Sequence, residues 1–490
     1  MIAALPVLAV FALIGSQRVK AWVAAVIGAA LSLGLATAVW SLPWPAALSA
    51  AAYGVATGLF PIVYIIWGSL LLYNLTVVTG WAERLRGSLA PLASDRHLLL
   101  LLIGFGFAAF LDSTAGFLTP VTVGTALLVG LGVPATEAAA YTLVASSLPP
   151  IFGAMSIPVL VMADVGHVPL HPLARAQAAV AAVLFVGFPL WLTGTFGGFA
   201  ALRRLWVTAI AAGIAYSAAL WWMVTRVSLY PAALAASLAA LGAILVTRRR
   251  IGGRGPSSPG ELWRSAVPWW PYWVLMACVA GWSVPPVARA LGRYSLAVRM
   301  PALQGIVWHV DALASPGTAI VATTALVALL GRASVAQVVR AARLSSRQVS
   351  YPLVNMLAMF ALAQVMNASG MTRTLGLAVA GAHGAFALLS PYLSWAGAAI
   401  AGSNTASNAL LGRLQSVTAA QLGLEPVFAL ALAGAAAPLG KMIAPQVISA
   451  AAAAGRLEGG EGRLLRVGLF HSLVWTSAIG LAGLLLDRAQ

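Results

Sequence analysis

The chain consists of long apolar blocks separated by short polar connections. Apolar residues fill each block continuously, without the stripe of an amphipathic helix or the alternation of a half-buried strand. The blocks lie at approximately 2–16, 21–40, 51–79, 97–111, 115–132, 138–163, 174–198, 205–225, 229–247, 266–284, 315–331, 351–369, 384–401, 404–412, 426–455 and 467–486. A run of about 20 apolar residues crosses a bilayer as a helix that satisfies its own backbone hydrogen bonds, so the pattern predicts an all-α polytopic membrane protein with about 12–14 membrane-crossing helices.

The composition agrees with a protein embedded in lipid, because 61% of the residues are hydrophobic and 8% are charged. The formal net charge of +17 could indicate nucleic acid, but the basic residues occupy the short connections between apolar blocks, where they follow the positive-inside rule. The connections expected on the cytoplasmic side carry Arg18 and Lys20; Arg84, Arg86 and Arg96; Arg203 and Arg204; Arg248, Arg249, Arg250 and Arg254; Arg340, Arg343 and Arg347; and Arg456, Arg463 and Arg466.

These connections predict a bacterial inner-membrane protein with both termini in the periplasm. The block 2–16 has the length of a signal peptide, but Arg18 and Lys20 follow it instead of preceding it, which favours a retained first span. The flexible stretch 248–265 predicts a cytoplasmic linker between an N-terminal half, 1–247, and a C-terminal half, 266–490. Residues 285–315 are too polar to span and predict an interfacial helix or a re-entrant loop.

A motif occurs once in each half. Residues 150–158 and 438–445 both contain Gly-x-Met-x-x-Pro, as Gly153, Met155 and Pro158 and as Gly440, Met442 and Pro445. Stretches rich in small polar residues precede the two copies by similar distances, LDSTAGFLTP at 111–120 and GSNTASNALLG at 402–412. The paired spacing indicates an internal repeat.

Paired breaks in the apolar blocks are the feature that points to a transporter's binding site. Helix breaks inside a membrane are tolerated where they are buried in protein or line a cavity, and helix N-termini there attract anions. The alternative is that Gly, Pro, Ser and Thr only kink or pack the helices. The breaks provide the predicted substrate-binding residues, which are Ser113, Thr114, Gly116, Gly153, Ser403, Asn404, Thr405, Asn408, Lys441 and Gln446.

Charged residues inside apolar blocks are costly and therefore suggest function. Lys441 stands inside the second Gly-x-Met-x-x-Pro break and could bind a substrate carboxylate. The alternatives are an ion pair with Asp311 or another acid, or snorkelling to an interface. Asp112 opens the first break and could carry a coupled proton, or it could only cap the following half-helix. Asp311 is a second proton-coupling candidate and could equally be an interfacial N-cap.

The motifs as a set resemble the lactate permease family. The resemblance rests on residues 104–132, FGAMSIPVLV at 152–161, VRMP at 298–301, HVDALASPGTAI at 309–320, LLSPYLSWAGAAIAGSNTASNALLGRLQ at 388–415, GKMIAPQ at 440–446 and HSL at 471–473. It implies a secondary transporter that imports lactate or glycolate with protons. It also implies the inverted repeats, helical hairpins and unwound helices of the larger ion transporter superfamily, whose Ser-Asn-Thr signature matches Ser403, Asn404 and Thr405.

The chain departs from that family pattern at two acids. Asp112, Ser113 and Thr114 stand where the family has Glu-Gly-Ala, and Asn404 stands where it has Asp. A sodium-coupled carrier of another organic anion, such as a dicarboxylate, is therefore the alternative, although a dianion would need a second intramembrane cation besides Lys441.

Other classes of function fit the sequence less well. The single cysteine, Cys278, and the scattered histidines form no metal-ligand grouping in the sequence, so we expect neither an enzyme nor a cofactor. A channel is not excluded by composition, but paired broken repeats favour alternating access. The expected partners are a small organic anion, a proton or possibly sodium, and the lipid bilayer, without nucleic acid; the sequence leaves the oligomeric state open.

Overall fold

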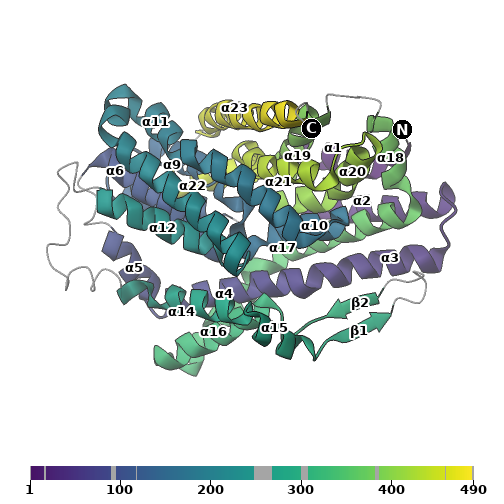
Figure 1. Cartoon of the computed structure of the whole chain (residues 1–490), viewed down its shortest axis with the longest axis horizontal. Coiled ribbons are helices and arrows are strands. Elements are labelled where there is room, and N and C mark those ends of the chain that lie inside the picture. Colours follow the sequence, from purple (N-terminus) through teal and green to yellow (C-terminus); the bar gives the residue numbers. More distant parts are fainter. Residues whose placement is uncertain are drawn as a thin grey trace.

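A computed structural model describes residues 2–15, 18–89, 95–116, 118–247, 267–299, 307–380, 386–457 and 460–487. The predicted linker 248–265 lies outside the described residues, so the division into halves at that point stays a prediction. Figure 1 shows helices lying side by side in one bundle, with α23 along its upper edge and a pair of short strands at its lower right.

The first half of the chain contains α1 (Leu5–Gly15), α2 (Ala21–Ala38), α3 (Trp44–Thr57), α4 (Tyr64–Val78), α5 (Trp81–Leu89), α6 (Arg96–Leu99), α7 (Ala108–Thr114), α8 (Thr119–Gly130), α9 (Ala135–Ala145), α10 (Gly153–Gly166), α11 (Leu170–Trp222) and α12 (Ala232–Thr247). The second half contains α14 (Trp270–Trp282), α15 (Pro285–Gly292), α16 (Pro316–Leu330), α17 (Val335–Ser369), α18 (Met371–Ala380), α19 (Phe386–Ala401), α20 (Asn404–Gln421), α21 (Pro426–Gly440), α22 (Pro445–Ala454) and α23 (Glu461–Asp487). The strands are β1 (Leu296–Arg299) and β2 (Val307–Val310).

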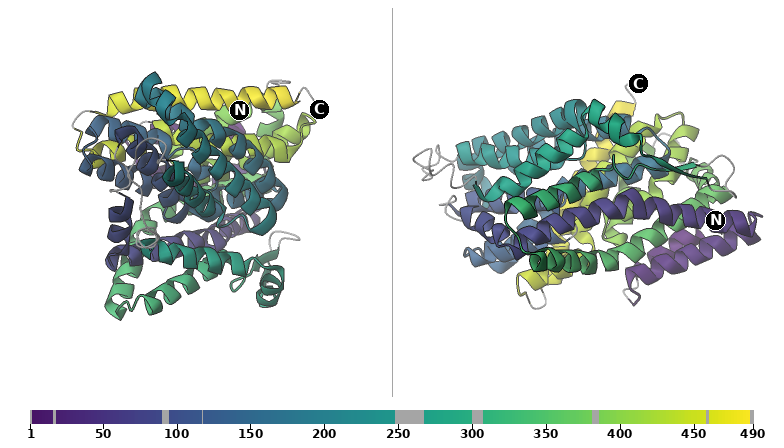
Figure 2. Two further views of the ribbon diagram at one scale, coloured as in Figure 1. Left: turned by 60° about the vertical axis from the view of Figure 1, so that its left-hand side comes forward. Right: turned by 90° about the horizontal axis from the view of Figure 1, so that it is seen from below.

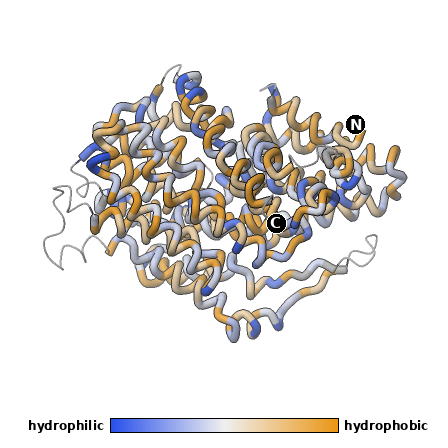
Figure 3. Tube along the Cα trace, turned by 45° about the horizontal axis from the view of Figure 1, so that its top comes forward, coloured by the Kyte–Doolittle hydropathy of each residue, from blue (hydrophilic) through white to orange (hydrophobic). Residues whose placement is uncertain are grey.

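The helices confirm the predicted polytopic membrane class, but fewer of the described helices than the predicted 12–14 are long enough to span, because several apolar helices have fewer than 18 residues. In the described ranges, six helical segments are long and apolar enough to cross a bilayer, and nine are if each of three bent helix pairs counts as one span. The longest, Leu170–Val227, turns at Gly198, whose positive φ of 68° interrupts α11 between two predicted spans. Hydrophobic colour follows the helices in Figure 3, and hydrophilic colour gathers mainly near helix ends and connections.

Two helical hairpins have matching construction. In the first, a π-helical segment, Leu100–Phe107, and α7 lead to Gly116, and α8 returns from it; in the second, α19 leads to Gly402, and α20 returns. Both glycines have positive φ, 60° and 67°, which side chains with a Cβ rarely adopt. Each tip therefore turns sharply where the sequence predicted a break.

The chain after each hairpin is also broken at the motif that the sequence repeats. After the first hairpin, α9 and α10 are bent by 51°, and Ala154, Met155 and Ser156 have left-handed backbone conformations. After the second, α21 ends in a 3-10 turn, Lys441–Ile443, before α22 begins at Pro445. Both copies of Gly-x-Met-x-x-Pro thus interrupt a helix.

The two hairpins enter the bundle from opposite sides. At the base of the first, Arg96 forms an ion pair with Glu137 of α9, and the end of α22 packs close by, with Gly455 beside the carbonyl of Ala135. At the other end of the broken α9–α10 crossing, Arg413 of α20 donates a hydrogen bond of 3.3 Å to the Gly166 carbonyl. α9 and α10 together therefore run from the base of the first hairpin to the side of the second. The two hairpins point in opposite directions, so the two repeats are inverted.

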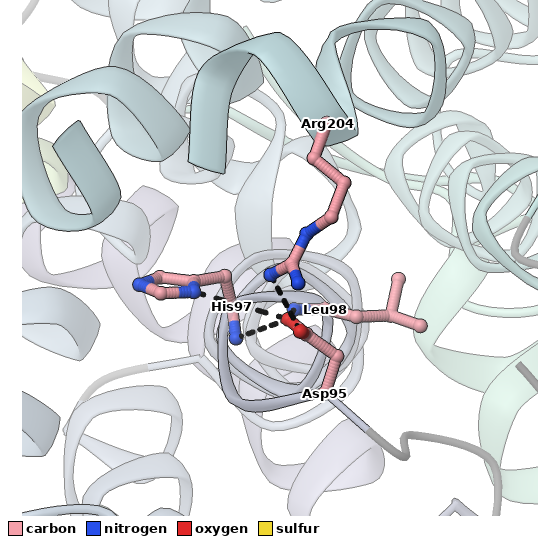
Figure 4. Close-up of polar contacts among 4 residues, drawn as sticks. All are labelled: Asp95, His97, Leu98 and Arg204. Carbon is pink, nitrogen blue, oxygen red and sulfur yellow. Dashed lines mark hydrogen bonds and ion pairs between the residues drawn. The ribbon is translucent and has the colours of Figure 1, made fainter. Parts of the chain in front are cut away.

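The base of the first hairpin is anchored to α11 by Asp95 (Figure 4). Its carboxylate accepts hydrogen bonds from the backbone N–H groups of His97 (2.8 Å) and Leu98 (3.1 Å), which caps the start of α6. The same carboxylate pairs with Arg204 at 2.5 Å. These contacts fix the direction in which the chain enters the hairpin.

Residues 285–315 differ in part from the prediction. α15 is the expected short surface helix and bends 71° from the preceding span, but β1 and β2 then pair antiparallel, with Leu296 opposite Val310. Figure 2 shows this part at the periphery of the bundle. The strands were missed because each has four residues, too few to establish an alternating pattern.

Candidate functional site

The hairpin tips and the two helix breaks surround one small cavity of about 60 Å³. Seven of the predicted site residues line it, and they are Asp112, Gly116, Gly153, Ser403, Asn404, Thr405 and Lys441. The remaining lining residues are Ile66, Pro150, Ala154, Ile157, Pro158 and Gly402. Residues about 330 positions apart in sequence thus meet at one point, as the paired breaks predicted.

Lys441 is the only basic residue that lines this cavity, and its side chain is 7% exposed. Among the described residues, no hydrogen bond or ion pair to a protein acceptor satisfies its ammonium group. Lys441 directly follows α21, where the negative end of the helix dipole favours a cation. A buried charge with so little compensation is costly without an anionic partner, so this position suits a carboxylate ligand.

Asp112 faces the same cavity and is 2% exposed. Its Oδ2 atom is buried without a hydrogen-bond partner. The carboxylate does not cap α8, because α8 begins at Thr119 after Leu118, which provides no side-chain cap. No ion pair joins Asp112 to Lys441 among the described residues, although both charges line one cavity. Neither a helix cap nor an ion pair therefore engages this carboxylate in the described part of the chain.

The N-terminus of α20 points into the cavity through Asn404 and Thr405. Ser403 is its N-cap, and the Ser403 hydroxyl accepts a hydrogen bond of 3.3 Å from the N–H of Ala406. The first N–H groups of an α-helix have no acceptor within that helix. Together with the positive end of the dipole, they favour an anion beside Lys441.

Two predicted substrate-binding amides join the two repeats. The Asn404 side chain donates a hydrogen bond of 2.7 Å to the Pro150 carbonyl, and Asn408 donates one of 3.0 Å to the Pro158 carbonyl. Asn404 also lines the cavity, whereas Asn408 does not. The two amides lie one turn apart on α20 and satisfy carbonyls at the break in the other repeat.

Four further predicted residues lie outside the cavity lining. The hydroxyls of Ser113 and Thr114 donate to the Phe110 carbonyl at 2.7 and 3.0 Å, so both are engaged within α7. Gln446 lies in an adjoining cavity against Gly402. Asp311 is exposed after β2 and lines none of the described cavities, and Ser315, not Asp311, caps α16. The structure therefore does not place Asp311 at the site.

Ile66, which extends the cavity wall from α4, was not among the residues predicted from the sequence. Ile66 follows a π-helical segment, Gly58–Val63, in which Phe60 has non-helical backbone angles. Pro61 within an apolar block is the signal that could have identified this third break.

Two larger cavities flank the site. One of about 510 Å³ shares Ile66, Gly402, Ser403 and Thr405 with it. The other, of about 380 Å³, has Asp164, Tyr53 and Trp308 in its lining and shares no lining residue with the site. The site thus shares part of its wall with the first of these cavities and none of it with the second.

Replacing Gly153 with alanine is expected to disturb the site directly. A methyl group at Gly153 would overlap Oδ2 of Asp112, and overpacking of this kind costs about 1–3 kcal/mol. Initial rates of substrate uptake should fall at least severalfold while the purified protein stays monodisperse. Gly34→Ala is the matched control, because nothing lies within 4 Å of the added methyl. Equal uptake by both variants would contradict the proposed placement of Asp112.

Comparisons with known proteins identify the family of the chain. The family model described as L-lactate permease matches residues 1–488. The chain is 32% identical to the glycolate permease GlcA of Escherichia coli K12, over 99% of this chain and 95% of that protein. It is 30% identical to the L-lactate permease of Bacillus subtilis, over 96% and 92%, and 29% identical to that of Escherichia coli K12, over 98% and 94%. The chain is therefore a multi-pass membrane transporter, not an enzyme, and belongs to the L-lactate permease family.

Proposed function

We propose that this protein is a secondary active transporter that imports a small 2-hydroxy monocarboxylate, such as lactate or glycolate, together with a proton. The observation that carries the proposal is Lys441, a buried lysine without a protein acceptor among the described residues, in a cavity between two opposing hairpins. The names of the relatives, glycolate permease and L-lactate permease, support this class of substrate.

The charges of the cavity favour a monoanion over a dianion. Lys441 is its single cation, and Asp112 is its single acid. A second substrate carboxylate would be desolvated beside Asp112 without a cation of its own, which is unfavourable. The small volume, about 60 Å³, also suits a short acid. A dicarboxylate is therefore the weaker candidate for this cavity.

The same charges provide a physical reason for proton coupling. With Lys441 positive and Asp112 ionised, a bound monocarboxylate would leave one net negative charge in a buried cavity. Protonation of Asp112 makes the loaded cavity neutral, which lowers the cost of burial. Binding of the anion and of the proton would then each favour the other, as thermodynamic linkage requires. Sodium is the alternative coupling ion, held by oxygen atoms at the hairpin tips.

The two flanking cavities support transport by alternating access. The 510 Å³ cavity shares lining residues with the site. The 380 Å³ cavity does not, but its lining residues Ile62 and Leu160 are close in sequence to Ile66 and Ile157, which line the site. Opening toward the second cavity would require α4 and α10 to separate at these side chains. We propose that the protein alternates between two such states in the bacterial inner membrane, with both termini in the periplasm.

Uptake into proteoliposomes tests the proposal. Purified protein is reconstituted and given labelled glycolate, lactate, acetate or succinate, under an imposed pH gradient or a sodium gradient in separate runs. We expect glycolate or lactate to accumulate when the interior is alkaline, with little succinate uptake. Labelled substrate inside should also exchange for unlabelled substrate outside, which distinguishes a carrier from a channel. Accumulation driven by a sodium gradient alone would mean that sodium, and not a proton, is the coupling ion. If no monocarboxylate is taken up, the proposed function is refuted.

A further inference from the structure

The 510 Å³ cavity next to the site has features of a second anion-binding position. It is bounded by Val19, Lys20 and the first residues of α2, by α17, by the start of α22 and by the tip of the second hairpin. It shares Gly402, Ser403 and Thr405 with the cavity of Lys441. The tip of the second hairpin is therefore a wall common to both cavities. We call this cavity the vestibule.

Of the described residues that line the vestibule, Lys20 is the ionisable one. No acid is among its lining residues, whereas Asp164 lines the flanking cavity on the other side. Lys20 is exposed, and its positive charge raises the local concentration of anions beside it. The vestibule is thus electrostatically suited to a carboxylate, and the opposite cavity is not.

The type and place of Lys20 are unusual for a residue that only sets topology. The chain has 28 basic residues, and Lys20 and Lys441 are its only lysines. Lys20 is the N-cap residue of α2, where the helix dipole disfavours a cation. An ammonium on a flexible stem binds a carboxylate as a point charge, without the paired hydrogen bonds of arginine. Such a group suits an anion that must be held briefly and released.

Two amide side chains complete the polar part of the vestibule wall. Asn355 of α17 has a buried Oδ1 atom without a hydrogen-bond partner. Gln446 of α22 packs against Gly402, between the vestibule and the site. A 2-hydroxy acid has a hydroxyl that can donate to Asn355 while its carboxylate faces Lys20. The wall therefore provides a positive charge and a free acceptor, the two kinds of group that a small hydroxy acid can use.

We propose that the vestibule is a second carboxylate-binding site, in which Lys20 holds the anion on its way to or from Lys441. The proposal rests on the transport function proposed above. It predicts that the charge at position 20 sets the apparent affinity for substrate in the folded, reconstituted protein. A residue with only a structural role would not respond to the sign of the charge placed there after folding.

Charge replacement through a cysteine tests this proposal. Lys20→Cys is made with Cys278→Ser, so that the introduced thiol is the only one in the chain, and the solubilised protein is treated before reconstitution. Aminoethyl methanethiosulfonate restores an ammonium, and sulfonatoethyl methanethiosulfonate introduces a sulfonate. We expect the half-saturation concentration for glycolate exchange to rise roughly three- to tenfold in Lys20→Cys, to recover after aminoethylation and to rise further after sulfonatoethylation.

The matched control is Arg203→Cys in the same Cys278→Ser background. Arg203 is exposed on α11 and lines none of the described cavities, so both reagents should leave its half-saturation concentration unchanged. Equal effects of both reagents at position 20, or no effect of either, would overturn the vestibule site alone. If the wild-type protein exchanges no monocarboxylate, the proposed function is refuted, and the vestibule site is refuted with it.

Discussion

Lys441→Ala is expected to abolish measurable substrate binding while the protein still folds and inserts. Lys441 is the single cation of the site cavity and is 7% exposed. Removing one partner of a desolvated charge pair costs about 2–5 kcal/mol, which corresponds to a roughly 30-fold to several-thousand-fold loss of affinity. Isothermal titration of the purified protein with glycolate and lactate measures the change.

Lys441→Arg separates charge from shape at this position. Arginine retains the positive charge but carries a larger, planar group into a cavity of about 60 Å³. We therefore expect binding that is weaker than in the wild type and stronger than in Lys441→Ala. Arg203→Ala is the control for loss of one positive charge at an exposed position. Near-normal affinity in Lys441→Ala would mean that the N-terminus of α20 and the hydroxyls of Ser403 and Thr405 hold the carboxylate.

Asp112→Asn is expected to abolish accumulation driven by a pH gradient and to leave exchange largely intact. The amide is similar in size to the carboxylic acid and keeps the loaded cavity neutral, so the substrate can still bind beside Lys441. Exchange requires no net release of a proton, whereas accumulation does. Parallel measurements of uptake under a pH gradient and of counterflow without one separate the two activities.

The second acidic candidate provides the control for this experiment. Asp311→Asn changes an exposed acid outside the cavity lining and should leave both activities unchanged. If Asp112→Asn still accumulates substrate under a pH gradient, Asp112 does not carry the proton. If Asp311→Asn alone loses accumulation, coupling takes place outside the cavity between the hairpins.

The apolar blocks and their interruptions were sufficient to predict the class of fold. Backbone groups in a bilayer must be satisfied within the helix, so a run of apolar residues predicts a span and a cluster of Gly, Pro and Ser predicts a break. Gly116 and Gly402 indeed turn with positive φ, and the segments around Met155 and Met442 interrupt helices. The resemblance of motifs also indicated the family, which the match over residues 1–488 confirmed.

Local sequence could not decide which side chains of a break face the cavity. Ser113 and Thr114 are in the break but donate to the carbonyl of Phe110, whereas Asp112 beside them faces the cavity. A helix rotates about 100° per residue, so adjacent residues point in different directions and only packing selects the one that faces inward. Packing also decides that the Asn408 side chain donates its hydrogen bond to the Pro158 carbonyl of the other repeat.

The sequence by itself therefore determined the spans, the breaks, the paired repeats and the choice of Lys441 as a candidate, because these follow from the cost of polar groups in lipid. Tertiary structure alone decided that Asp112 shares a cavity with Lys441 and that Asp311 does not. It also brought Lys20 to a cavity that adjoins the hairpin at Gly402, although about 380 residues separate the two in the chain. Contacts of this kind depend on how distant helices pack, and no local pattern of residues encodes them.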